Sequence, residues 1–400
     1  MFRTHRTTST VGATVGTTRG RWRLTAAAAA ATGLALAGCG TTEDSSDSGS
    51  GDTSASSCKP ATLAYLGSTT GDTGALGQNM VGGIKLALDE YNKDNPDCKV
   101  DVKVFDSQGS PEKATPLATQ IVSDDSFVGL IGPGFSGESL ATGKTFAEAG
   151  LPVISPSATN VTITQQGWTN WHRVIGNDEA QGAADARYIT DTVGAKKVFV
   201  ADDGSDYGKG LAQFITKGLG DLVVDNDTVS TGQTDFSATV TKVKASGADA
   251  FFFAGYYPEA GLLAKQLRQS GFKGLFMSGD GSEDPQFVQA AGAQAAEGAI
   301  LSAPAGPPPA DFNDKYKAVN GSDAGLYSTQ SYDAANIFLA GLQDGASTHE
   351  DMNTFIGSYT GDGVSGPLAF DDKGDITEST IYAYTVKNGK LDTENPTPIK

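Results

Sequence analysis

The chain has 400 residues, which exceeds one ordinary domain core, so we expect two packed lobes. Its composition is globular, with 38% hydrophobic and 19% charged residues. The formal net charge of −18 argues against nucleic acid and anionic lipid surfaces as partners.

The N-terminal segment has the pattern of an export signal. Its arginines precede an Ala-rich apolar run from Thr25 to Ala37, and a Leu-Ala-Gly-Cys sequence, which resembles the bacterial lipobox, ends at Cys39. Basic, apolar and then small residues are typical of secretory signals, and the run is too short and too alanine-rich to span a bilayer stably. We expect residues 1–38 to be a signal peptide and Cys39 to be lipidated, which would anchor the exported protein to the outer face of the cell membrane. The alternative is a secretory signal with an incidental cysteine.

The next segment predicts a tether and a disulfide. Residues 40–57 are rich in Ser, Gly, Asp and Thr and contain no apolar residue larger than alanine. Such composition is typical of a flexible linker, so we assign residues 39–57 to the lipidated cysteine and its tether. Cys58 and Cys98 remain as an even pair in an oxidising compartment, and we expect them to form a disulfide.

From Cys58 onward, short apolar runs alternate with helical patterns. Strands are expected at Thr62–Leu66, Val100–Phe105, Phe127–Ile131 and Pro152–Ile154, and after Arg173 at Val198–Ala201, Leu222–Val224, Ala250–Ala254, Leu275–Ser278 and Ala299–Ser302. Such alternation predicts parallel sheets with helices on both faces. Two successive runs of this kind predict two lobes.

The C-terminal part predicts a return between the lobes. The proline-rich stretch Pro304–Pro309 interrupts regular structure and is expected to cross from one lobe to the other. Helical patterns follow, and the chain finishes with strand-like runs at Pro367–Phe370 and Ser379–Val386. Ligands of open α/β sheets bind beyond the carboxyl ends of the strands, so two facing lobes predict a cleft with a hinge.

Motifs for catalysis and metal binding are incomplete. Residues 134–138 (Gly-Phe-Ser-Gly-Glu) resemble a nucleophile elbow, but Glu138 stands where the tight turn needs Gly. The glycine-rich residues 71–77 lack both the Walker ending and the GxGxxG spacing. His172 and His349 have no metal-ligand spacing, and the acid clusters at 202–206 and 280–284 do not follow the calcium-loop pattern. We therefore expect no enzymatic activity, no cofactor and no metal.

Polar residues after the predicted strands would suit a zwitterionic ligand. Ser136 and the segment Ser157–Thr159 precede helices or follow strands, where hydroxyls and free N–H groups can receive a carboxylate. Asp280 follows a strand of the second lobe and could receive an ammonium group. An apolar or aromatic wall could come from Leu76, Tyr207, Tyr256 and Tyr327. The residues alone leave an alternative open, in which the hydroxyls and Asp280 are helix caps and the tyrosines are packing residues.

At these residues the chain resembles the leucine/isoleucine/valine-binding proteins of ABC importers, a family of type I periplasmic binding proteins. The resemblance covers about residues 60–390 and rests on an ordered series of runs: 70–83, 131–132, 152–160, 206–208, 235–237, 255–259, 296–298 and 370–375. It implies an α/β fold of two doubly wound parallel-sheet lobes joined by a three-strand hinge, with crossovers near 174–179, 303–309 and 374–379. The implied N-terminal lobe is 58–176 plus 305–375, and the implied C-terminal lobe is 177–304 plus 376–400.

The resemblance also implies roles for single residues. Ser136 and the Thr159 backbone would bind the carboxylate, and the Ser157 carbonyl and Thr159 hydroxyl would bind the ammonium, with Ala158 between them. The side-chain pocket implied by the family consists of Leu76, Phe135, Tyr207, Tyr256 and Tyr327. Two positions depart from close relatives, because Asp280 stands where they have Glu and Leu76 where they have an aromatic residue. Both changes bear on which amino acid fits.

We therefore predict an exported, lipid-anchored and monomeric substrate-binding protein of an ABC importer. Its partners would be a free α-amino acid, in the first place a branched-chain aliphatic one, and the permease subunits. The alternatives are another amino acid, an amide or an aromatic acid in the same fold, a sensory ligand-binding module, or an enzyme.

Overall fold

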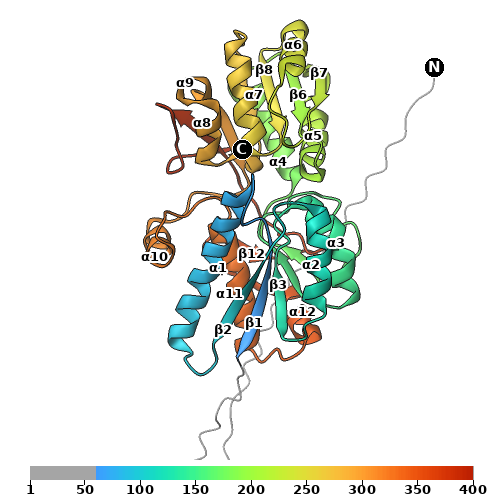
Figure 1. The fold of residues 1–400 in the computed structure, drawn as a ribbon, viewed down its shortest axis with the longest axis vertical. Coiled ribbons are helices and arrows are strands. Elements are labelled where there is room, and N and C mark those ends of the chain that lie inside the picture. The colour runs from blue at the N-terminus through green and yellow to red at the C-terminus, as the bar shows by residue number, and fades with distance from the viewer. Residues whose placement is uncertain (1–59, 400) are drawn as a thin grey trace, which may run out of the picture. The chain divides into compact units, whose positions relative to one another are not determined.

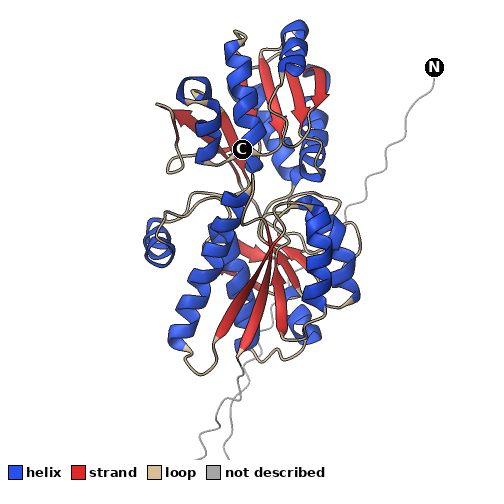
Figure 2. Ribbon diagram, viewed as in Figure 1, coloured by secondary structure: helices blue, strands red, loops and turns tan. Residues whose placement is uncertain are grey.

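The structure is a computed structural model that describes residues 60–399. The predicted signal peptide, Cys39, the tether and Cys58 lie outside the described residues. Figure 1 shows the described part of the chain as two groups of helices and strands, and Figure 2 shows helices on both sides of the strands in each group.

The first sheet consists of five strands in the order β2-β1-β3-β4-β5, and all of its neighbours pair in parallel. Their bounds are β1 Ala61–Gly67, β2 Val100–Asp106, β3 Phe127–Ile131, β4 Val153–Ser155 and β5 Trp171–Arg173. Every residue of β4 and β5 is buried. Both faces of these two short strands are therefore covered, as expected for a parallel sheet.

The first lobe contains helices from two distant parts of the chain. Their bounds are α1 Gly74–Asp94, α2 Pro111–Val122, α3 Ser136–Glu148, α10 Ala310–Asn320, α11 Ser328–Gln343 and α12 His349–Gly357. The local signals are clear at α2, where the Ser110 hydroxyl accepts a hydrogen bond from the Lys113 N–H and Pro111 occupies the first helical turn. Further along the chain, α11 packs against α1, and α12 packs against β3.

The second sheet has the order β14-β13-β10-β9-β8-β6-β7, and β15 pairs with β13. Its strands are β6 Val198–Asp202, β7 Val223–Thr228, β8 Ala250–Ala254, β9 Leu275–Ser278, β10 Ile300–Ala303, β13 Ile381–Lys387, β14 Lys390–Leu391 and β15 Thr397–Ile399. The neighbours from β6 to β10 pair in parallel, whereas β13 is antiparallel to β10. The connection explains the antiparallel pairing. After β10 the chain goes to the first lobe, and it enters the second sheet again at β13 without a helix that crosses over the second sheet.

The helices of the second lobe follow its strands in the predicted alternation. They are α4 Asp178–Arg187, which continues into a π-helical turn at Tyr188–Val193, α5 Asp206–Leu219, α6 Ser237–Ser246, α7 Tyr257–Gln269, α8 Pro285–Ala291 and α9 Ala293–Ala296. Short 3₁₀ turns lie at Gly220–Leu222 and Asp280–Ser282. The core of this lobe is built on β8, whose residues Phe251, Phe252 and Phe253 are all fully buried.

The chain passes between the two sheets three times. It leaves the first sheet after β5, returns after β10 to α10, and enters the second sheet again at β13. Before the last passage it forms an antiparallel hairpin of β11 Thr360–Gly363 and β12 Gly366–Ala369, which belongs to neither large sheet. The residue limits that we assigned to the two lobes stay a prediction.

Candidate ligand-binding site

A small cavity lies where the carboxyl ends of strands from both sheets meet. Its lining residues come from loops and helix starts of both lobes: Leu76, Gly134, Phe135, Ser136, Ser157, Tyr207, Tyr256, Asp280 and Tyr327. All of them except Gly134 belong to the set predicted from the sequence. The two other predicted residues, Ala158 and Thr159, do not line the cavity but are buried next to Ser157.

On the first lobe, two loops that follow neighbouring strands are tied together. Ser136 is the first residue of α3, and its hydroxyl accepts a hydrogen bond of 3.3 Å from the Asn160 N–H. In return, the Ser157 hydroxyl donates to the Gly134 carbonyl over 2.7 Å. The start of a helix carries N–H groups without intrahelical partners and a partial positive charge. This corner of the cavity is therefore suited to an anionic group.

Asp280 lies on the opposite side, with only 1% of its surface exposed. Its Oδ1 accepts a hydrogen bond of 2.8 Å from the Tyr207 hydroxyl, and its Oδ2 accepts one from the Tyr327 hydroxyl. Burial raises the pKa of Asp280, and the two tyrosine hydroxyls counteract this rise. We predicted these tyrosines as walls of a side-chain pocket, and the structure adds that both direct their hydroxyls at the carboxylate.

Tyr327 holds an uncommon backbone conformation at the start of α11. Its φ angle is +68°, in the left-handed region that side chains other than glycine seldom adopt. Such conformations cost about 1–3 kcal/mol and concentrate at functional sites. Because Tyr327 follows the crossover back into the first lobe, this backbone places a first-lobe hydroxyl on a carboxylate of the second lobe.

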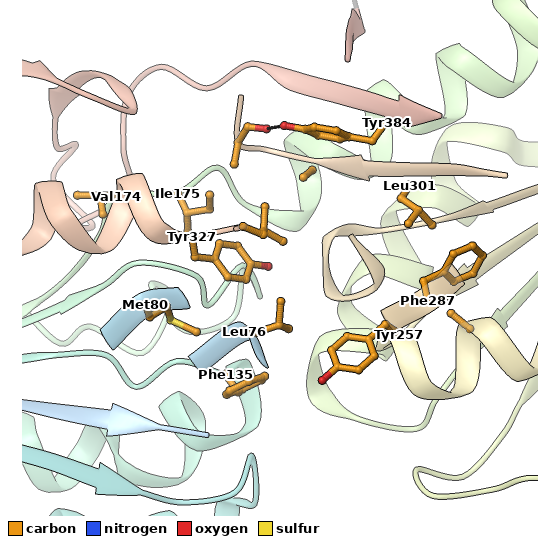
Figure 3. Close-up of a cluster of buried hydrophobic side chains, with 14 of the residues drawn as sticks. Leu76, Met80, Phe135, Val174, Ile175, Tyr257, Phe287, Leu301, Tyr327 and Tyr384 are labelled. Carbon is orange, nitrogen blue, oxygen red and sulfur yellow. Dashed lines mark hydrogen bonds between the residues drawn. The ribbon is translucent and has the colours of Figure 1, made fainter. Parts of the chain in front are cut away.

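Aromatic and aliphatic side chains form the rest of the wall. The ring centroids of Phe135 and Tyr256 are 5.5 Å apart, and those of Tyr207 and Tyr256 are 5.1 Å apart, so the rings of both lobes are in contact. Figure 3 shows Leu76, Phe135 and Tyr327 on the first lobe, facing the second. The cavity thus has an apolar side next to its polar corner and its carboxylate.

A second carboxylate that the sequence analysis did not single out lies near Thr159. Asp178, the first residue of α4, is fully buried, and burial raises its pKa to about 7, while the nearby Thr159 hydroxyl lowers it. Within residues 60–399, neither oxygen of this carboxylate has a hydrogen-bond partner, and neither does the Thr159 hydroxyl. The only sequence signal for Asp178 was its place at a helix start, which is where ordinary capping acids also occur.

Asn160 is another site residue missed by the sequence analysis. Its N–H donates to Ser136, and its side-chain amide donates over 2.6 Å to the Asp206 carbonyl at the start of α5 in the second lobe. It therefore connects the loop of Ser157 and Thr159 with the opposite lobe. Its place directly after Thr159 in the family-like run 152–160 was the available signal.

The two described histidines lie away from the cavity. The His172 ring packs edge-on against Phe370, with centroids 4.9 Å apart, and burial lowers its pKa to about 4. A ring nitrogen of His349 is hydrogen-bonded to the Phe127 carbonyl over 2.8 Å. Among residues 60–399, no group of three or more His, Cys, Asp or Glu side chains is arranged to hold a metal ion. Both histidines are thus engaged in packing or backbone contacts.

Cys98, one of the two predicted disulfide cysteines, is disulfide-bonded. Its predicted partner, Cys58, lies outside the described residues, so the pairing stays a prediction. Among the helices formed by residues 60–399, none combines the length and the apolar character needed to cross a bilayer.

Known proteins resemble this chain over most of its length. The sequence profile of a periplasmic binding protein family matches residues 60–390. The Leu/Ile/Val-binding protein BraC3 of Rhizobium johnstonii is 31% identical over 82% of this chain and 92% of its own. A leucine-, isoleucine-, valine-, threonine- and alanine-binding protein of Pseudomonas aeruginosa is 28% identical over 80% of this chain and 89% of its own.

A solved structure agrees with these matches. The branched-chain amino acid transporter substrate-binding protein LivJ of Streptococcus pneumoniae, solved in complex with isoleucine, superposes with a TM-score of 0.78 at 27% identity, covering 85% of this chain and all of that one. The chain therefore belongs to the periplasmic binding proteins, and within them to the leucine/isoleucine/valine-binding family, whose type I fold of two α/β lobes it shares.

Proposed function

We propose that this protein binds a free α-amino acid with a branched aliphatic side chain between its lobes and delivers it to the permease of an ABC importer. The observation that carries the proposal is the cavity itself. It combines a helix start that carries a hydroxyl, a buried carboxylate and an apolar wall. A zwitterion with an aliphatic side chain complements these three features, and the relatives named above bind such amino acids.

The ligand carboxylate is assigned to the start of α3. Ser136 supplies a hydroxyl there, and the first turn supplies N–H groups that the helix leaves unpaired. The neighbouring Thr159 backbone is expected to contribute as well. No formal positive charge is required, because the helix end itself favours an anion.

The ligand ammonium is assigned to Asp280, the Ser157 carbonyl and the Thr159 hydroxyl, with Asp178 behind them. Buried acceptors without a partner cost about 1–3 kcal/mol each. Within the described residues, neither oxygen of Asp178 accepts a hydrogen bond of ordinary geometry, although the Thr159 hydroxyl lies close enough to lower the pKa of this carboxylate. A ligand ammonium beside Thr159 would supply a further donor to this buried group.

The apolar side chain is assigned to Leu76, Phe135 and Tyr256. All three residues line the cavity, together with the carboxylate of Asp280.

The remaining parts of the proposal concern the cellular setting. We propose that the protein is exported, that Cys39 carries a lipid anchor, that Cys58 pairs with Cys98, and that the folded body acts as a monomer without enzymatic activity. These points are supported by the N-terminal sequence pattern, the disulfide at Cys98 and membership of a family of binding proteins.

A ligand panel tests the function. Thermal unfolding with each common L-amino acid should show stabilisation by leucine, isoleucine or valine, because ligand at about 100 times Kd adds about 2.7 kcal/mol. The bound compound should be recovered chemically unchanged at one equivalent, as expected of a binding protein. Ser136→Ala should weaken binding, whereas the control Ser139→Ala, on the same helix but outside the cavity lining, should not. Stabilisation by none of the amino acids would refute the proposal.

A further inference from the structure

Arg173, the last residue of β5, is fully buried and has all of its N–H groups engaged. Its Nη1 donates to the Ala158 carbonyl over 2.9 Å and to the Asn160 carbonyl over 3.0 Å. Its Nε and Nη2 both lie 2.5 Å from Oδ1 of Asp375, and Nη2 also donates to the Thr164 hydroxyl over 3.3 Å. A guanidinium has five N–H donors, and five polar contacts are present.

Two of these contacts hold the peptide groups on either side of Thr159. The carbonyl of Ala158 precedes Thr159, and that of Asn160 follows it. The Thr159 carbonyl in turn accepts from the Asp178 N–H over 3.0 Å, and the Asn160 N–H donates to Ser136. The orientation of the Thr159 backbone is therefore held in part by a guanidinium that itself lies outside the cavity lining.

The other contacts join this guanidinium to the hinge. Asp375 lies in the connection that leads to β13, and its Oδ2 accepts from Thr164 over 3.2 Å and from Asn177 over 3.4 Å. The backbone of Arg173 also donates to the Gly374 carbonyl over 2.9 Å. Arg173 and Asp375 thus connect the first crossover, after β5, with the third crossover, before β13.

We infer that Arg173, held by Asp375, is a positioning residue that fixes the Thr159 loop for the ligand and links its geometry to the hinge. This inference deepens the proposed function and rests on it. Lysine cannot replace the arginine, because its ammonium lacks the planar fork that serves a carboxylate and two carbonyls at once. Asp375→Asn keeps the shape of the side chain that Arg173 contacts but removes its negative charge.

The test compares Arg173→Lys and Asp375→Asn with a matched control, Asp333→Asn. Asp333 is also a buried carboxylate of the first lobe, where it accepts from the N–H groups of Val364 and Ser365 over 2.9 and 2.8 Å. All three variants lose buried polar contacts, but only the first two touch the Thr159 loop. Arg173→Lys is the more disruptive change, and if it does not fold, Asp375→Asn carries the test.

Two readouts are measured on the full exported protein. Hydrogen exchange without ligand should become at least tenfold faster in peptides covering residues 157–163 of Arg173→Lys and Asp375→Asn, while β1 exchanges as in wild type. Titration with L-leucine should show at least tenfold weaker binding for these two variants and wild-type affinity for Asp333→Asn. A general loss of stability would instead affect the control equally.

The two readouts separate this inference from the proposed function. Absence of amino-acid binding by wild type would refute the proposed function, and the exchange of residues 157–163 would still decide whether Arg173 holds the loop. Wild-type exchange in both variants, or wild-type leucine affinity despite faster exchange, would overturn the positioning role. Equal effects of Asp333→Asn on the loop and on binding would overturn it as well.

Discussion

The Tyr327 hydroxyl donates a hydrogen bond to the Asp280 carboxylate, and this bond joins the two lobes. The donor stands at the start of α11, which packs against the first sheet, and the acceptor follows β9 of the second sheet. Tyr207 donates to the other oxygen of the same carboxylate. Because the contact between Tyr327 and Asp280 joins the two lobes, separating them would break it. We therefore propose that Asp280, assigned above to the ligand ammonium, also stabilises the closed arrangement.

Replacing Tyr327 by Phe should weaken closure and ligand binding together. A hydrogen bond to a charged group contributes about 1.5–3 kcal/mol, which corresponds to a loss of about tenfold to a hundredfold in affinity. Titration with leucine measures the affinity, and X-ray scattering with saturating ligand measures the radius of gyration. Tyr316→Phe is the control, because its hydroxyl donates to the Asn79 carbonyl within the first lobe. Equal affinities of the two variants would contradict the role of the contact between the lobes.

Asp280→Asn should weaken amino-acid binding by about tenfold to a hundredfold, since a charged hydrogen bond contributes about 1.5–3 kcal/mol. The same change should leave the affinity for a deaminated analogue, 4-methylpentanoate, nearly unaltered, because that ligand has no ammonium. Calorimetric titration of both ligands against both proteins forms a double-mutant-style cycle. Asp284→Asn, at the neighbouring cap of α8, is the matched control. A coupling energy near zero would remove Asp280 from the ammonium site.

The disulfide predicted between Cys58 and Cys98 closes a loop of about 40 residues, and the chain-entropy model gives it about 3–4 kcal/mol of stabilisation. A variant with both cysteines replaced by Ala should unfold at a lower temperature, with ligand affinity unchanged. Peptide mapping without reductant should recover the two cysteines in one linked fragment. Two alkylatable thiols on the native protein would contradict the pairing.

Cys39→Ala should abolish lipid attachment, because the modified cysteine of the predicted signal would be missing. In cells fed a labelled fatty acid, the wild-type protein should carry the label, and the variant should accumulate as precursor or appear without lipid. Cys98→Ala serves as the control for loss of a cysteine as such. Labelling of Cys39→Ala at the wild-type level would exclude the anchor.

Most strands and most cavity residues could be predicted from the sequence, because they depend on the pattern of residues along short segments of the chain. Short apolar runs define β3, β6 and β8, and in parallel sheets the residues that follow such strands gather at one edge. Strand β7 was predicted too short, as Leu222–Val224 instead of Val223–Thr228. Its polar residues stand at the edge of the sheet, where no apolar pattern marks them.

The pairings across the site could not be predicted in the same way. The contact of Arg173 with Asp375 and that of Tyr327 with Asp280 join residues far apart in the chain. The first contact depends on how two crossovers pack against each other, and the second depends on how the two lobes face each other. Both also depend on side-chain direction, which periodicity does not encode. An arginine directly after buried Trp171 and His172 was nevertheless a signal, because a fully buried arginine requires partners.

The ionisation of Asp178 should make stability depend on pH. Burial raises its folded-state pKa to about 7, whereas the unfolded value is about 3.9. Between these two values the folded state binds a proton that the unfolded state has lost, so stability falls as the pH rises. Relative to Asp178→Asn, wild type should lose up to about 1.4 kcal/mol of unfolding free energy per pH unit between about pH 4 and pH 7. Denaturant unfolding of both ligand-free proteins across this range measures the difference between their unfolding free energies. The titration of His172 and of other groups present in both proteins cancels in that difference. A difference that does not change with pH would show that Asp178 is already ionised in the folded protein.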